Sequence, residues 1–224
     1  MTFDRETALE RFHGFQPGVR HPVRSRLNAW LFRVLDGYQH RRLGGVKREA
    51  FGGLTPTVLE IGAGTGANLR YLGAGTRVIA IEPNRHMHPY LRAAARRWGI
   101  HLDLREGAAE RLPLPDASVS TVISSLVLCS VRDPEVVLRE IQRVLRPGGR
   151  FWCVEHVRAP EGTALATLQR LVARPWRWFF EGCECRDVAS LLGAAGFASV
   201  EVEPFTFRTI FLPVRTAISA VALK

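Results

Sequence analysis

The sequence predicts a single α/β domain built on a mostly parallel sheet. Three observations lead to this prediction. Short apolar runs alternate with helical patterns along most of the 224 residues, the first run ends in three glycines at alternate positions, and the second run ends in an acidic residue. Strands that alternate with helices are typical of β-α-β units, in which crossover helices join parallel strands. An apolar content of 46% is enough to fill the core of one domain.

A helical N-terminal extension, which we place at residues 1–50, precedes this alternation. Residues 1–20 contain the breakers Gly14, Pro17 and Gly18 and are expected to be loosely structured. Farther along, apolar side chains recur at three- and four-residue steps: Leu27, Trp30, Leu31, Val34, Leu35 and Tyr38. This spacing predicts one or two helices between Ser25 and about Ala50. We expect the first four of these side chains to form the inner face of a cover over the functional site.

The main domain is predicted to span residues 51–224. Its apolar runs predict seven strands: Thr57–Ile61, Arg77–Ile81, His101–Arg105, Val119–Leu126, Arg150–His156, Ala198–Glu203 and Ile218–Leu223. Helical patterns between the runs predict four helices: Gly66–Leu72, Arg85–Trp98, Pro134–Leu145 and Asp187–Ala195. Pro147-Gly148-Gly149 is expected to turn the chain back into the fifth strand.

The strongest chemical signal is a glycine loop at the end of the first predicted strand. Gly62, Gly64 and Gly66 follow the apolar run and precede a helical pattern. Glycine lets the backbone turn tightly and approach a ligand without a clash at Cβ. The same spacing also suits a plain strand–helix turn, or a dinucleotide fingerprint whose third glycine would stand at Ala67. The loop by itself leaves these alternatives open.

A second signal is Glu82, which ends the second predicted strand. A carboxylate at this position accepts hydrogen bonds from ribose hydroxyls, and Pro83-Asn84 then bends the chain into the next helix. On its own, Glu82 also suits an acid that complements the dipole at a helix N-terminus. Since the strand that carries Glu82 lies beside the glycine loop, ribose binding is the better interpretation.

Two further segments, Gly107–Ser118 and Leu138–Gly149, extend the pattern. Together with the glycine loop and Glu82 they resemble the motifs of class I S-adenosylmethionine (SAM)-dependent methyltransferases. Val58–Gly66 is similar to the first motif of that family, and Glu82 matches its ribose acid. Gly107–Ser118 is similar to the loop of the subgroup that includes quinone-biosynthesis enzymes. The four segments occur in the order and at the spacing of the family, which disfavours a dinucleotide-dependent oxidoreductase.

This resemblance implies a seven-stranded, mostly parallel Rossmann-like sheet, with SAM as cofactor and S-adenosylhomocysteine as its product. It also implies the cofactor-binding residues: Glu60, Gly62, Ala63, Gly64, Gly66, Asn68, Glu82, Pro83, Asn84, Gly107, Ala108, Ala109, Glu110, Ser125 and Leu126. The family usually carries Asp where this sequence has Ala108. Recognition of adenine is therefore expected to depend on backbone groups or on Glu110.

A narrower resemblance involves Gly66-Ala67-Asn68, Leu126–Val131, Glu155-His156-Val157 and Gly182-Cys183. These segments look like those of the methyltransferase-like proteins that methylate small alkyl thiols. The match implies S-methylation of a small thiol; the alternative is O-, N- or C-methylation of a small aromatic or quinone-like metabolite. Those relatives carry a hydrophobic N-terminal membrane anchor. Met1–Glu10 shows neither such an anchor nor a secretory signal, so we expect a cytoplasmic protein without a transmembrane segment.

The candidate acceptor site contains His156, which ends the fifth predicted strand beside the expected position of the methyl group. His156 is the candidate general base; the alternative is a strand-end histidine bonded to the backbone. A thiol needs little help from a base, because free thiols have a pKa near 8.5. Cys129 is expected to be a small wall residue of the pocket rather than a covalent nucleophile. Trp30 and Trp178 complete the candidate pocket, although Trp178 also suits core packing.

The formal net charge is +10, and much of it is concentrated near the N-terminus. Eight basic residues stand against Asp36 alone between Arg20 and Arg48, a local charge of +7. Such an excess suits nucleic acid, a membrane surface or an acidic substrate, or else a solvated helical face. No RNA-binding signature accompanies it, so the expected partner is a small methyl acceptor and not nucleic acid.

The four cysteines are Cys129, Cys153, Cys183 and Cys185. Two of them lie in apolar runs, and reduced thiols are expected for all four. Cys183-x-Cys185 lacks the spacing of a zinc site or of a thioredoxin-type motif. The sequence therefore predicts no metal site.

Overall fold

The computed structural model describes residues 21–54 and 56–224, so the expectation of a loosely structured 1–20 segment lies outside the described residues. The helices and strands follow one another in this order: α2 (Pro22–Phe51), β1 (Thr57–Ile61), η1 (Leu69–Tyr71), β2 (Arg77–Ile81), α3 (His88–Trp98), β3 (His101–Arg105), β4 (Val119–Ser125), α4 (Pro134–Val144), β5 (Leu145–His156), α5 (Ala164–Phe179), α6 (Val188–Ala194), β6 (Ser199–Thr206), η2 (Leu212–Val214) and β7 (Thr216–Leu223).

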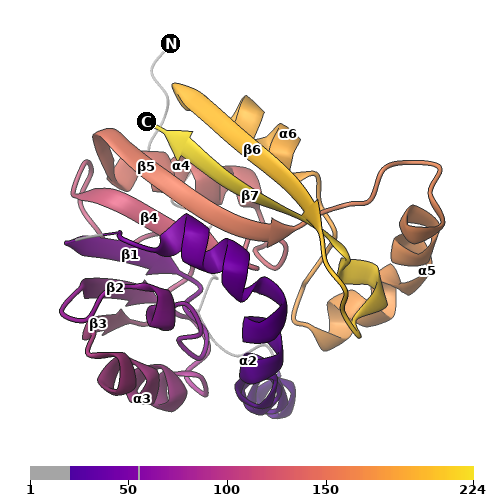
Figure 1. The fold of residues 1–224 in the computed structure, drawn as a ribbon, viewed down its shortest axis with the longest axis horizontal. Coiled ribbons are helices and arrows are strands. Elements are labelled where there is room, and N and C mark those ends of the chain that lie inside the picture. The colour runs from indigo at the N-terminus through magenta and orange to yellow at the C-terminus, as the bar shows by residue number, and fades with distance from the viewer. Residues whose placement is uncertain (1–20, 55) are drawn as a thin grey trace.

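The seven strands form one sheet in the order β3-β2-β1-β4-β5-β7-β6 (Figure 1). Strands β1 to β5 pair in parallel, and β7 runs antiparallel to both β5 and β6. The expected seven-stranded, mostly parallel sheet is confirmed. The chain adds strands outward from β1 to β3 and then returns to place β4 on the other side of β1. In open α/β sheets, ligands bind beyond the carboxyl ends of the strands at such a reversal.

Apolar side chains fill the space on both faces of the sheet. One face packs against α4 and α6 through a cluster that includes Leu59, Ile61, Val122, Leu138, Ile141 and Leu192. The other face packs against α2, η1 and α3 through a cluster that includes Phe51, Val58, Leu69, Val78 and Leu91. Because both faces are covered, the central strands are apolar at nearly every position. The carboxyl ends of these strands carry the polar residues described below.

From residue 21 on, the N-terminal extension forms one helix of 30 residues, α2, which lies in front of the sheet in Figure 1. The prediction of which face of α2 points inward is wrong, because Leu27, Trp30 and Val34 are 43%, 54% and 57% exposed. The N-terminal half of α2 buries small and polar residues instead: Ser25, Asn28 and Ala29. Short side chains allow this half to approach the loops beneath it closely enough for hydrogen bonds.

Two hydrogen bonds show how α2 docks. The Asn84 side chain donates to the Ser25 carbonyl at 3.1 Å, and the Asn28 side chain donates to the Phe179 carbonyl at 3.0 Å. At its other end, α2 runs through residue 50, the predicted domain boundary, and buries Phe51 completely among the strands. The extension is therefore packed into the core at its C-terminal end.

Three further segments differ from the sequence predictions. The expected helix Gly66–Leu72 is only the short 3-10 helix η1, and Gly66, with a φ of +83°, lies outside it. Strand β5 begins already at Leu145, with a register shift against β4. Helix α5 was not predicted, since Pro175 stands inside it and apolar residues occur in it at mixed spacing.

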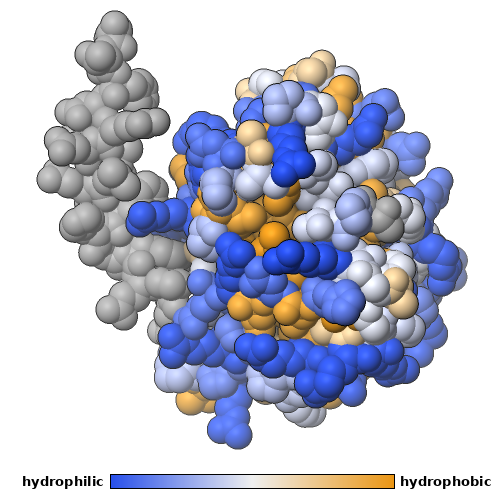
Figure 2. Space-filling model, turned by 90° about the vertical axis from the view of Figure 1, so that its left-hand side faces the viewer, coloured by the Kyte–Doolittle hydropathy of each residue, from blue (hydrophilic) through white to orange (hydrophobic). Residues whose placement is uncertain are grey.

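Figure 2 shows the left-hand side of the molecule in Figure 1, where hydrophilic side chains surround a smaller apolar area. Such a mixture is normal, since apolar atoms make up over half of most protein surfaces. Within residues 21–54 and 56–224, no helix combines the length and the apolar composition needed to cross a bilayer.

Candidate active site

The glycine loop lies at the carboxyl end of β1, and its three glycines have different surroundings. All three have a positive φ, of 59°, 56° and 83° for Gly62, Gly64 and Gly66. A Cβ added at Gly62 would stand 2.6 Å from the Val127 side chain, and one at Gly66 would stand 2.8 Å from that of Ala94. A Cβ at Gly64 would meet no atom closer than 3.7 Å. Gly62 and Gly66 thus allow close packing, whereas Gly64 leaves space in which a ligand can reach the backbone.

The Glu82 carboxylate lies across from this loop, at the end of β2. It accepts hydrogen bonds from the backbone N–H groups of Gly64 and Asn84, both at 2.8 Å. Burial raises the pKa of Glu82 to about 7, although these two hydrogen bonds oppose the rise. A carboxylate has about four acceptor positions, so two remain for the two hydroxyls of a ribose. The position therefore fits the predicted ribose-binding role.

A buried network of polar side chains lies next to the glycine loop. The Lys47 ammonium donates to the Asn68 side chain at 2.9 Å, and Asn68 donates to the Glu60 carboxylate at 2.7 Å. Burial lowers the pKa of Lys47 to about 8 and raises that of Glu60 to about 7. Sequence reasoning counted Lys47 among the charges of a solvated face, but only 4% of it is exposed. The helix α2 thus contributes a charge to the base of the site.

Two buried oxygens near the strand ends have no hydrogen-bond partner among the described residues: Oε2 of Glu60 and the hydroxyl of Ser125. A buried polar atom without a partner costs free energy, so such atoms are suited to a ligand. A carboxylate oxygen suits the ammonium group of SAM, and a hydroxyl suits any polar group. Together with the open space at Gly64 and the Glu82 carboxylate, these atoms fit a bound SAM molecule.

The loop after β4 is held in an unusual conformation. Leu126 has a φ of +59°, a left-handed conformation that costs a non-glycine residue about 1–2 kcal/mol. The buried Glu155 carboxylate stabilises this turn, because it accepts hydrogen bonds from the Ser124 hydroxyl and the Val127 N–H, both at 3.0 Å. Glu155 was not among the candidate site residues. In the sequence, Glu155 was noted only within the narrower resemblance, in Glu155-His156-Val157.

The loop predicted to contact adenine lies beside the same turn. Ala108 and Ala109 are buried, and the Glu110 carboxylate accepts a hydrogen bond from the Arg132 N–H at 2.8 Å. Glu110 therefore joins this loop to the one after β4. The contact of adenine with the backbone of residues 107–110 stays a prediction.

A small hollow of about 50 Å³ lies beside Leu126 and His156. Its other lining residues come from α2 and from the connection between β6 and β7: Tyr38, Gln39, Arg42, Leu43, Phe207, Thr209, Phe211 and Val214. The Tyr38 hydroxyl accepts a hydrogen bond from the Ile210 N–H at 2.8 Å, which joins these two segments. A hollow of this size admits only a small chemical group.

The structure does not bring the two candidate tryptophans to this hollow. Trp30 lies in a separate outer groove of about 600 Å³, next to Arg85 and His86. Trp178 is 64% exposed, and the guanidinium of Arg24 lies over its ring at 5.5 Å from the ring centre. Their expected contact with the acceptor has no support in this arrangement, because both side chains point outward.

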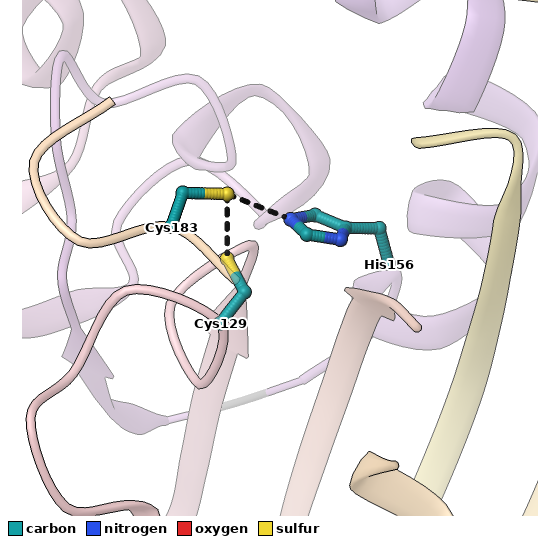
Figure 3. A group of neighbouring side chains, drawn as sticks. All are labelled: Cys129, His156 and Cys183. Carbon is teal, nitrogen blue, oxygen red and sulfur yellow. Dashed lines mark hydrogen bonds between the residues drawn. The ribbon is translucent and has the colours of Figure 1, made fainter. Parts of the chain in front are cut away.

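His156 and Cys129 do come together, and Cys183 lies between them (Figure 3). The Cys183 sulfur is 3.1 Å from Nε2 of His156 and 3.7 Å from the Cys129 sulfur. The Cys185 sulfur lies 3.8 Å from Nδ1 of His156. Both ring nitrogens therefore face sulfur atoms, so the alternative of a histidine bonded to backbone is wrong. Cys183 was noted only in the narrower resemblance, through Gly182-Cys183.

Cys183 and His156 shift each other's pKa. The contact with Cys129 and the charge of His156 hold the pKa of the Cys183 thiol well below its usual value, against the effect of burial. Burial lowers the pKa of His156, but the charge of the Cys183 thiolate outweighs it and raises the pKa to about 10. An imidazole that holds its proton is a poor general base. The role of His156 as a base stays a prediction that this pairing does not favour.

Comparison with known proteins bears on the same segments. Residues 59–153 match a family model described as a methyltransferase domain. The chain is also 33% identical to human thiol S-methyltransferase TMT1B over 220 residues, which is 92% of this chain and 90% of the relative. This chain is a class I SAM-dependent methyltransferase.

Two more comparisons concern a second relative and the fold. It is 35% identical to human thiol S-methyltransferase TMT1A over 170 residues, which cover 70% of this enzyme and 69% of that one. A solved SAM-dependent methyltransferase from Thermotoga maritima superposes with a TM-score of 0.65 at 21% identity, covering 92% of this chain and all of that one. The second comparison shows the fold alone.

Gly64→Ala is expected to reduce the affinity of the enzyme for SAM at least tenfold while the domain stays folded. The added methyl group would enter the open space at Gly64, and the left-handed φ would cost about 1–2 kcal/mol of stability. Gly75→Ala is the matched control, since Gly75 also has a positive φ, of 84°, with no atom near an added Cβ. Calorimetric titration with SAM and thermal unfolding measure both effects. Equal SAM affinity of the two variants would show that the cofactor does not approach Gly64.

Proposed function

We propose that this methyltransferase transfers the methyl group of SAM to the sulfur of a small thiol. The observation that carries the proposal is the similarity over 92% of the chain to a relative named a thiol S-methyltransferase. The site offers three physical arguments in support, which concern the cofactor, the hollow and its charge.

The residues that would bind the cofactor lie at the carboxyl ends of the strands and have hydrogen-bond acceptor positions without a partner among the described residues. Glu82 would accept from the ribose hydroxyls, the backbone at Gly64 would lie against the cofactor, and Glu60 would bind the ammonium group. When bound, SAM supplies the methyl group as an electrophilic sulfonium. The protein must then hold the acceptor close to the methyl carbon, in line with the bond that breaks, and exclude water.

The hollow beside Leu126 and His156 would receive the acceptor. Its small volume favours a small reacting group, and its lining is largely apolar. The described residues that line it include no Asp, Glu or Lys to remove a proton from an alcohol. A thiol needs less help, because its pKa near 8.5 leaves an appreciable thiolate fraction near neutral pH. The guanidinium of Arg42, which also lines the hollow, would favour the negative thiolate.

The test is to incubate the enzyme with SAM labelled in the methyl group and with a panel of small thiols, phenols and amines. We expect small thiols to be methylated, with a rate that rises with pH and levels off near the pKa of the bound thiol. Glu82→Ala, which disables the cofactor site, serves as the negative control. Clear methylation of a phenol or an amine without turnover of any thiol would overturn the proposal and support the alternative acceptors.

A further inference from the structure

Three potential metal ligands from separate segments meet beyond the ends of β4 and β5 (Figure 3). Cys129 follows β4, His156 ends β5, and Cys183 follows α5. The ligand atoms of these three side chains all lie within 4.8 Å of one another. A tetrahedral zinc ion, with Zn–S near 2.3 Å and Zn–N near 2.0–2.1 Å, holds two sulfurs about 3.8 Å apart and a sulfur and a nitrogen about 3.6 Å apart. The observed sulfur–sulfur separation of 3.7 Å matches the tetrahedral value. The sulfur–nitrogen separation of 3.1 Å between Cys183 and His156 is shorter than its tetrahedral value, and all ligand atoms lie within 4.8 Å of one another, so small side-chain rotations would complete the geometry.

The backbone holds the two cysteine segments together. The Glu184 N–H donates to the Cys129 carbonyl at 2.8 Å, and the Arg186 side chain donates to the Leu128 carbonyl at 3.2 Å. Gly182, with a φ of +105°, lets its segment come so close that an added Cβ would stand 3.1 Å from the Ser130 carbonyl oxygen. These contacts involve no side chain of the three ligands, so the ligands are brought together by the fold itself.

The surroundings of the cluster suit a cation bound by sulfur. Cys129, His156 and Cys183 are 0%, 3% and 8% exposed, so a thiolate here needs a positive partner in place of water. The indole N–H of Trp176 donates to the Cys183 sulfur at 3.3 Å, an outer contact of the kind that orients metal ligands.

We propose that Cys129, His156 and Cys183 bind one Zn²⁺ ion and leave its fourth coordination position to the acceptor thiol. Two thiolates and an imidazole form a ligand set that zinc prefers, and three protein ligands with one open position are typical of catalytic zinc sites. His156 lines the hollow that would receive the acceptor, so the ion would lie next to that hollow, within reach of an acceptor sulfur. The assignment of the fourth ligand rests on the proposed function.

The zinc ion would activate the acceptor by ionising it. A thiol that coordinates zinc loses its proton to water and binds as a thiolate. An electron pair of the bound sulfur then forms the new bond to the methyl carbon, while the bond from that carbon to the sulfonium sulfur breaks. Its electrons stay on S-adenosylhomocysteine, and the neutral thioether leaves the metal. No oxidant or reductant is needed.

This site was not expected from the sequence, because the spacing of Cys183-x-Cys185 argued against a metal. Cys185 contacts the other ring nitrogen of His156 and is not among the three ligands. Ligands that are 27 residues apart on three segments leave no local pattern. Only the fold brings them together.

The site is tested by measuring the metal content of the full chain, purified without a metal-binding tag, in a reducing buffer, after zinc loading and dialysis. We expect about one zinc ion per chain, and close to none in Cys129→Ser and Cys183→Ser. Cys153→Ala is the matched control, because Cys153 is equally buried but lies outside the cluster. Calorimetric SAM binding shows that each variant is folded. Cobalt replaces zinc for spectroscopy, and a thiolate-to-cobalt absorption band should appear only when both cysteines are present.

The results separate the zinc site from the thiol proposal. A folded wild-type chain that holds no zinc, or a Cys129→Ser variant with as much zinc as the wild type, would overturn the site. Zinc binding without turnover of any thiol would contradict only the acceptor. If both hold, a small thiol should shift the visible bands of the cobalt-loaded enzyme, and a spectrum unchanged at saturating thiol would exclude the thiol as fourth ligand.

Discussion

Glu82→Ala is expected to weaken SAM binding by about tenfold to more than a hundredfold. Charge-assisted hydrogen bonds contribute about 1.5–3 kcal/mol each, and 1.4 kcal/mol corresponds to a factor of ten in affinity. The substitution removes the bonds expected to the ribose and also the acceptor that holds the Gly64 and Asn84 N–H groups. Calorimetric titration measures the loss. Unchanged affinity in a folded variant would rule out the ribose assignment.

Glu82→Gln is the sharper companion variant, because the amide keeps one acceptor oxygen. Its effect on SAM affinity should be milder than that of alanine. Its effect on stability should depend on pH. The folded pKa of Glu82 is about 7 against an ordinary 4.5, so the folded state holds the proton more tightly than the unfolded state does. The stability that this carboxyl contributes is therefore present at low pH and is lost as the pH rises toward 7.

The amide NH2 of glutamine cannot accept one of the two backbone hydrogen bonds, a loss that is the same at every pH. The melting temperature of SAM-free Glu82→Gln relative to the wild type should nevertheless rise between about pH 4 and about pH 8, because only the wild-type side chain ionises. Thermal unfolding at the two pH values checks this result. The same difference at both pH values would mean that the carboxyl ionises normally in the folded protein. The expected rise would mean that the ionised Glu82 costs stability in the absence of SAM, which is common for groups placed to bind a ligand.

Lys47→Met is expected to lower the free energy of unfolding by about 3–5 kcal/mol, the usual cost of removing one partner from a buried charged network. The Asn68 oxygen would lose its donor, and Glu60 would lose the nearby positive charge. Arg48→Met is the control, since Arg48 is exposed on the same helix and its substitution removes the same charge. Its effect should stay within about 0.5 kcal/mol.

Urea denaturation of Lys47→Met, Glu60→Gln and the double variant measures the coupling between the two charges. The double variant should recover much of the loss, because a neutral glutamine no longer needs a buried cation. Strictly additive effects would show that Lys47 and Glu60 act independently. Lys47 would then stabilise the fold only through the packing of its side chain.

Features that are continuous in the chain were predictable from the sequence. The strands β1, β2 and β3 have the expected bounds. For β1 and β2 the reason is that strands buried on both faces appear as apolar runs, whereas β3 is only partly buried and its pattern in the sequence is weaker. The glycine loop and Glu82 were identified for the same reason, since each stands directly at the end of such a run.

Features that depend on contacts between distant segments were not predictable. Nothing local distinguishes the buried Lys47 from the exposed Arg48 beside it, because only the packing of α2 on the sheet decides which is covered. The apolar spacing of α2 predicted a helix correctly but not its inward face. The meeting of Cys129, His156 and Cys183 required the path of three separate segments.

The residues expected to bind the cofactor and those that line the small hollow come from different parts of the sequence. Cofactor contacts are expected from residues 60–126, inside or next to the segment shared with the methyltransferase domain, whereas most of the hollow is built from residues 38–43 and 207–214 at either end. With the acceptor in this hollow, as proposed above, mutations in those two outer stretches would alter which acceptor fits without changing the groups expected to hold SAM. Evolution, or a designer, would then exchange the acceptor one short segment at a time and keep the methyl donor unchanged.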